Sequence, residues 1–152
     1  MKKFLFTLLA VSLFAFANES IDYPDGYRSW THLKTSIIKQ HDIKMFIGIS
    51  HIYANKKATD GLKTNHYKKG AVFVLDHLNM KNTKAYIQEG KRVFLGVMLY
   101  DPKRFKQTGN WGFESFAGDS KTKRGVTDST KQCFSCHTQA KKRSFVFSSF
   151  RK

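Results

Sequence analysis

The sequence predicts an α+β fold, with an antiparallel β-sheet of about four to five strands between an N-terminal and a C-terminal helix. Runs of β-branched and aromatic residues, separated by turn-forming residues, recur between residues 45 and 116. A stretch with helical apolar spacing precedes these runs, at 27–40, and a short polar helix-like segment follows them, at 128–142. Because the strand-like runs are grouped rather than alternating with helices, we expect an antiparallel sheet.

The amino-terminal segment, residues 1–17, has the form of a secretory signal peptide. Lys2 and Lys3 precede an apolar stretch, which ends in a small-x-small sequence, Ala15-Phe16-Ala17. The apolar stretch is too short to span a bilayer comfortably, so a retained anchor is the less favoured alternative. We therefore predict a cleaved signal peptide, export to the periplasm without stable membrane insertion, and a single domain over residues 18–152.

The expected first helix covers "YRSWTHLKTSIIKQ", residues 27–40. It follows Asp25-Gly26, and its apolar residues are spaced so that they fall on one helical face: Trp30, Leu33, Ile37 and Ile38.

Four later segments have strand character: "MFIGISHIYAN", "GAVFVLDHL", "RVFLGVMLY" and "NWGFESF". The turn signals "KKG", "DPK" and "TGN" lie at or between them. In the second segment, alternation places Phe73, Leu75 and His77 on one face together with Ala71, and it places Val74 on the other face with Val72 and Asp76.

The chain is strongly basic, with 27 Lys and Arg against 11 Asp and Glu and a net charge of +16. Basic clusters with interleaved aromatic residues suit nucleic acid in a cytosolic protein, but an exported protein rarely meets nucleic acid. We therefore expect no nucleic-acid partner. The charge predicts solubility and attraction to an acidic redox partner protein or an anionic membrane surface.

The segment "KQCFSCHTQAKK" holds both cysteines of the chain, Cys133 and Cys136, followed directly by His137. A disulfide between them would close a small loop and stabilise little, and zinc needs further ligands that the motif lacks. Cys-x-x-Cys-His is instead the attachment motif of haem c, with two thioether bonds from the thiols and the histidine as axial iron ligand. We predict one covalently bound haem c and keep zinc and a disulfide as alternatives.

A sixth iron ligand would have to come from upstream, because no Met or His follows His137. An open iron binds small gases or substrates, whereas an iron with two protein ligands only transfers electrons. The candidates are Met45, Met80, Met98, His32, His41, His51, His66 and His77.

Taken in order with the haem motif, several segments resemble the cytochrome P-460 family, which includes the cytochromes c′-beta. They are "YRSWTHLKT", "HIYAN", "YKKGAVFVLD", "VMLYDPKRFKQTGNWGFESF" and "RSFVF". The resemblance covers nearly the whole chain after the signal peptide. It implies a small antiparallel sheet with helices, a homodimer, and a five-coordinate haem held by the motif histidine.

The resemblance implies that one residue position distinguishes two branches of this family, which differ in their chemistry. Cytochromes P-460 oxidise hydroxylamine and cross-link a strand lysine to the haem edge, but that position here is Leu75, which cannot form the link. Lys68 and Lys69 lie in the preceding turn and look poorly placed to replace it. Cytochromes c′-beta lack the link and bind nitric oxide or carbon monoxide in an apolar distal pocket capped by phenylalanine.

The resemblance to cytochrome c′-beta therefore predicts an apolar distal pocket. Phe73 is the expected cap, Phe46 on the neighbouring strand a second cap, and Arg143 a proximal residue or propionate ligand. Core packing is the alternative for both phenylalanines, and a solvated side chain is the alternative for the arginine.

The leading functional hypothesis is a periplasmic carrier or scavenger of nitric oxide. One alternative is hydroxylamine oxidation, with Glu114 or Asp119 as a proton relay. The other is simple electron transfer through a six-coordinate iron.

Overall fold

The computed structural model describes residues 20–150 and shows one five-stranded sheet, in which the strands are neighbours in chain order. Every neighbouring pair is antiparallel. The strands are β1 (Thr31–Ile38), β2 (Gly48–Ala54), β3 (Val72–Asn82), β4 (Ile87–Tyr100) and β5 (Trp111–Ala117). The predicted α+β class is confirmed, and the signal peptide predicted at residues 1–17 lies outside the described residues.

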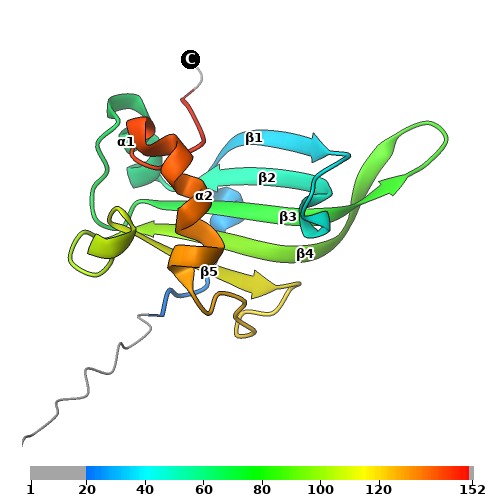
Figure 1. Ribbon diagram of the computed structural model, residues 1–152. Coiled ribbons are helices and arrows are strands. Elements are labelled where there is room, and N and C mark those ends of the chain that lie inside the picture. The colour runs from blue at the N-terminus through cyan, green and yellow to red at the C-terminus, as the bar shows by residue number, and fades with distance from the viewer. Residues whose placement is uncertain (1–19, 151–152) are drawn as a thin grey trace, which may run out of the picture.

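Two helical regions lie on the same side of this sheet (Figure 1). One is α1 (Lys56–Thr64), and the other is a C-terminal helical segment made of three pieces: η4 (Thr130–Phe134), α2 (Ser135–His137) and η5 (Thr138–Arg143). This segment confirms the helix predicted around the cysteine motif. Short 3-10 turns complete the chain: η1 (Tyr27–Ser29), η2 (Lys44–Phe46) and η3 (Lys106–Thr108). Among residues 20–150, no helix is both long and apolar enough to cross a bilayer.

The helix predicted over residues 27–40 is wrong, because most of this stretch is the edge strand β1. A bulge interrupts its pairing with β2 between His32 and Lys34. The bulge shifts the alternation of side chains, so that Leu33 packs against the core cluster that contains Phe73. Trp30 packs against the cluster on the other face of the sheet. Apolar residues that point to two different faces therefore mimic the spacing of one helical face.

The four segments predicted as strands are confirmed as β2 to β5, and the two faces of the sheet carry separate core clusters. We call the face covered by α1 and the C-terminal helical segment the site face. Its buried cluster is Ala54, Ala58, Ala71, Phe73, Met98, Trp111, Phe113 and Val146. The opposite face carries Ile21, Tyr27, Val74, Leu95, Val97 and Phe116. The predicted alternation along β3 is thus confirmed, since Phe73 and Val74 belong to different clusters.

A buried carboxylate ties the N-terminal residues to the opposite face. Asp76 on β3 is fully buried and accepts hydrogen bonds from the Tyr27 hydroxyl (2.5 Å), Arg28 (2.7 Å) and Arg92 (2.6 Å). Burial opposes ionisation of Asp76, but the hydrogen bonds from Arg92, Tyr27 and Arg28 outweigh burial and lower the carboxyl pKa. The network fixes η1 against the sheet.

Candidate functional site

The cysteine motif lies in the C-terminal helical segment. One of its two thiols faces the sheet. Cys133 is half-buried against the site-face cluster, whereas Cys136 is exposed. Both are free thiols. Burial, with smaller contributions from Glu114 and Cys136, raises the pKa of the Cys133 thiol to about 11. Two unjoined thiols one helical turn apart are the form that adds to the vinyl groups of a haem.

His137 is held in a defined orientation by one hydrogen bond and two aromatic rings. Its Nδ1 lies 2.8 Å from the main-chain carbonyl oxygen of Phe145, and its ring lies 4.8 Å from Phe113 and 5.0 Å from Phe147. A carbonyl oxygen can only accept, so Nδ1 carries the proton and Nε2 keeps its lone pair. Burial lowers the pKa of His137, more than the Phe145 carbonyl raises it, which favours the neutral imidazole. A neutral ring with a free Nε2 is the form of histidine that ligates a metal.

Next to Phe113, which packs on His137, a row of residues running across four strands is partly exposed. The register pairs Ile52 with Leu75, Leu75 with Gly96, and Gly96 with Ser115. All four residues are half-exposed, although they occupy the middle of the sheet. We call Ile52, Leu75, Gly96 and Ser115 the open row.

Buried residues flank the open row on both sides along the same face. One flank is Ala54, Phe73, Met98 and Phe113, and the other includes Ser50, His77 and Phe94. Because Phe113 touches the ring of His137, the row begins next to the histidine. A Cβ at Gly96 would stand 3.4 Å from that of Leu75, so any larger side chain there would fill the space over the row.

The residues present fit a haem c. The site offers two free thiols, an imidazole with a free Nε2, and a mostly apolar, partly exposed row on the same face of the sheet. The zinc alternative fits less well. Among residues 20–150, no group of three or more His, Cys, Asp or Glu side chains is arranged to hold a metal ion.

The predicted distal residues have different surroundings. Leu75 lies in the open row, as expected for a residue over a cofactor. Phe73 is only 6% exposed and its ring packs on Tyr67 (5.9 Å) and Trp111 (5.8 Å), which are the contacts of a core residue.

Phe46 was expected on a strand, but it lies in η2, before β2 begins. Its ring contacts His77 (6.3 Å) and Phe94 (5.7 Å), two of the buried residues that flank the open row. The turn forms because the chain must reverse direction between the edge strand β1 and β2. This places Phe46 over the sheet end rather than in the sheet.

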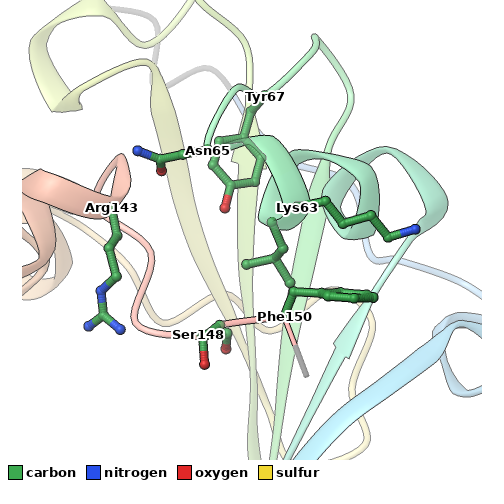
Figure 2. Close-up of a pocket in the computed structure, with 8 residues that line it drawn as sticks. Lys63, Asn65, Tyr67, Arg143, Ser148 and Phe150 are labelled. Carbon is green, nitrogen blue, oxygen red and sulfur yellow. The ribbon is translucent and has the colours of Figure 1, made fainter. Parts of the chain in front are cut away.

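Arg143 lines a cavity of about 590 Å³ between α1 and the C-terminal residues. Figure 2 shows Arg143 on one side of this cavity, the hydroxyl of Tyr67 pointing into it, and Phe150 on the opposite side. Lys63 also borders the cavity, and its Nζ lies 5.0 Å over the ring of Phe150. Arg143, predicted on the proximal side, thus borders α1, whereas His137 lies against β5. The role of Arg143 toward a haem remains a prediction.

Of the predicted sixth ligands, His77 and Met98 are the two that flank the open row. Met98 is buried in the site-face cluster. His77 is fully buried, and its Nδ1 lies 2.8 Å from the Ser50 hydroxyl, but its Nε2 has no hydrogen-bond partner of good geometry. Burial lowers the pKa of His77, although the nearby carbonyls of Ile47 and Met45 oppose this effect. Met45, His32, His41 and His66 are exposed, and Met80 and His51 are half-exposed.

Both predicted proton-relay carboxylates are engaged elsewhere. Glu114 accepts a hydrogen bond from Arg124 (2.8 Å) and, by alternation along β5, points away from the face that carries Phe113. Asp119 is exposed and pairs with Arg92. Neither is brought to His137.

One functional contact was missed by sequence reasoning: the main-chain carbonyl of Phe145, which holds His137. A main-chain acceptor has no residue-type signature. The open row was missed for a similar reason, since its members are separated in sequence and become neighbours only through the strand register.

An antiparallel sheet that carries a Cys-x-x-Cys-His helix and an open apolar row defines the class of haem-binding cytochromes. The cytochrome P460 family matches residues 24–148, and the chain belongs to this family. A comparison with curated proteins gave no match. The resemblance found in the sequence is thereby confirmed at the level of the family, and closeness to the cytochromes c′-beta stays a prediction.

Proposed function

We propose that the protein is a periplasmic cytochrome that binds nitric oxide at a single covalently attached haem c. Cys133 and Cys136 form the two thioether bonds, and Nε2 of His137 ligates the iron. The observation that supports this assignment most strongly is the hydrogen bond from Nδ1 to the Phe145 carbonyl, which leaves Nε2 as the free donor directly beside the two thiols.

The haem iron, when bound, supplies the position at which a gas ligand binds. The chain supplies the polarity of the surroundings. In the open row, Ile52, Leu75 and Gly96 have no polar side-chain atoms, and the hydroxyl of Ser115 lies toward Gly125, where an added Cβ would be 2.5 Å away. Bound oxygen depends on hydrogen-bond donors for its partial negative charge, whereas nitric oxide binds ferrous iron without them. An apolar row therefore favours nitric oxide.

The surroundings of the lysines give little support to hydroxylamine oxidation of the P-460 kind. Leu75 occupies the position expected for the cross-linking lysine. Lys69 is paired with Asp101 (3.1 Å), and Lys68 is exposed in the same turn. Arg124 engages Glu114 and Arg92 engages Asp119, so neither carboxylate adds support for this chemistry.

Electron transfer through a six-coordinate iron is the second candidate, and one observation favours it. His77 flanks the open row with an unpartnered, buried Nε2, which is unusual for a histidine in a core. This candidate predicts a low-spin spectrum of the oxidised protein without added ligand, and loss of that spectrum in His77→Ala.

Two kinds of partner are proposed, a second copy of the chain and an acidic protein. We propose a homodimer and an acidic redox partner, since the net charge of +16 attracts anionic surfaces. Export is proposed from the signal peptide at residues 1–17.

The proposed gas binding is tested by adding nitric oxide to the reduced holoprotein and recording the optical spectrum. We expect a complete spectral change at about one equivalent of gas, and the same change with carbon monoxide at higher concentration. A spectrum that does not respond to nitric oxide would rule out the proposed function while leaving the haem assignment intact.

A further inference from the structure

The carbonyl that holds His137 belongs to a backbone segment with an uncommon conformation. Ser144 and Phe145 are consecutive non-glycine residues with positive φ values of 51° and 65°. This left-handed conformation is unfavourable for residues with a Cβ, and two in succession persist only where their surroundings fix them. Without this double left-handed turn, the Phe145 carbonyl would not be aimed back at the ring of His137.

Two parts of the chain that are distant in sequence from the turn, Trp111 and Asn65, fix it by hydrogen bonds. The indole Nε1–H of Trp111, on β5, donates to the carbonyl of Ser144 at 2.9 Å. The hydroxyl of Ser144 donates to the carbonyl of Asn65, after α1, at 3.0 Å, and the Asn65 side-chain amide donates to the carbonyl of Lys142 at 3.3 Å. Each bond satisfies a group at the turn and anchors it to the sheet or to the end of α1.

Packing fixes the turn as well as hydrogen bonding. The ring of Phe145 lies against Gly109, where an added Cβ would be 2.4 Å away, and packs on the ring of Phe134 in a tilted arrangement at 5.1 Å. Trp111 itself is completely buried among Tyr67, Tyr100 and Phe73. A rigid, buried indole thus provides the fixed point from which the turn is held.

We propose that Trp111 is a positioning residue for the axial histidine: by holding the Ser144 carbonyl, it keeps the Phe145 carbonyl on Nδ1 of His137. This inference rests on the proposed ligation of haem iron by His137. A hydrogen bond to Nδ1 fixes the ring orientation and makes Nε2 a stronger donor. Trp111 therefore sets the strength of the iron–histidine bond without touching the haem ligand itself.

The test uses the holoprotein with Trp111→Phe, which keeps an aromatic ring in the core, removes the N–H donor and leaves a smaller side chain. Trp30→Phe is the matched control, since Trp30 packs against the cluster on the opposite face. Resonance Raman spectra of the reduced protein, recorded before any gas is added, report the iron–histidine stretching band. We expect this band to shift to lower frequency and the reduction potential to rise in Trp111→Phe, with neither change in Trp30→Phe.

Ser144→Ala provides a second variant should Trp111→Phe fail to fold. It removes the hydroxyl bond to Asn65 and leaves the core unaltered, and the same band should move in the same direction. A wild-type band and potential in every folded variant would overturn the inference. Because the band is measured without nitric oxide, a protein that shows the expected shifts but does not bind the gas would disprove the proposed function alone.

Discussion

At the scale of single residues, His137 is held in the tautomer that can ligate a metal. His137 has its Nδ1 committed to the Phe145 carbonyl, so only Nε2 can donate to a metal. The two thiols beside it are unjoined. Ser115 is the one residue of the partly exposed open row that has a polar side chain, so the polarity of the row is decided by very few side chains.

Leu75 is the residue whose replacement most directly tests that polarity. Leu75→Gln would place an amide N–H donor in the open row, and a hydrogen bond of about 1.5 kcal/mol corresponds to roughly tenfold in affinity. We expect oxygen to dissociate about tenfold more slowly from the reduced variant, measured by flash photolysis. Leu75→Met, of similar volume but without a donor, should behave like the wild type. Equal oxygen kinetics in all three proteins would show that the row does not face the ligand.

Asp76 is the residue on which the opposite face depends most. Asp76→Asn removes the buried counter-charge of Arg92 and leaves it only the exposed Asp119, so we expect a loss of about 3–5 kcal/mol in the free energy of unfolding by urea. Asp119→Asn, which removes only the exposed partner of Arg92, should change little. A loss no larger than in this control would mean that the network contributes no stability.

The same carboxylate gives a stability that depends on pH in a fixed direction. The pKa of Asp76 is lowered in the folded state, so its contribution is present above the unfolded value of about 3.9. It is lost as the pH falls through the lower, folded value. Urea midpoints measured between neutral and strongly acidic pH should fall less steeply for Asp76→Asn than for the wild type.

At the scale of elements, local patterns predicted the strands β2 to β5 and the haem-motif helix, but not β1 or α1. The strands β2 to β5 combine β-branched residues with alternation, so local preference and pairing agree. In β1 the bulge near Leu33 disrupts the alternation, and only pairing with β2, a non-local contact, makes the stretch a strand. The first helix was therefore predicted wrongly for a structural reason.

Helix α1 was not predicted because it is short and polar, with only nine residues. Its one strong signal is the N-cap Asn55, whose side-chain oxygen accepts from the backbone N–H of Ala58 (2.9 Å) and Val72 (3.1 Å). The same amide donates to the carbonyl of Gly70 at 2.8 Å. One side chain thus joins the start of α1 to the start of β3.

Asn55→Ala should therefore destabilise the protein by about 1–2 kcal/mol, a value typical for the loss of a helix N-cap. Chemical denaturation followed by circular dichroism measures this change. Asn55→Asp keeps the accepting oxygen but sets a second acceptor oxygen against the Gly70 carbonyl, so it should recover no more than about half of the lost stability. If the alanine variant unfolds at the wild-type midpoint, the cap does not hold α1 in solution.

At the scale of the whole molecule, one face of the sheet carries the candidate site and the other carries a closed, stabilising core. The opposite face is closed by the N-terminal residues and the Asp76 network, and the site face carries the cysteine helix and the open row. The motif itself was readable from the sequence, because its chemistry depends on three nearly adjacent residues. The row, the Phe145 carbonyl and the Trp111 anchor were not, because each depends on contacts between distant parts of the chain.

The high net charge makes a definite prediction for the proposed homodimer. Cleavage of the predicted signal peptide removes Lys2 and Lys3 and lowers the net charge of each chain from +16 to +14. Two such chains repel one another, and salt screens that repulsion over a Debye length of about 10 Å at 0.1 M. Light scattering should therefore show a fraction of dimer that increases as the salt concentration rises. A monomer at every salt concentration would remove the homodimer from the proposal.

The intact mass of the mature protein, purified from the periplasm, tests the central assignment most directly. We predict the mass of the chain from about residue 18 onward plus one haem, added through two thioether bonds and no other link. Cys136→Ala should retain less covalent haem, and the double variant lacking both thiols should retain none. A haem-free mass for correctly exported protein would contradict the account, and a mass showing a third covalent bond would move the protein to the hydroxylamine-oxidising branch of its family.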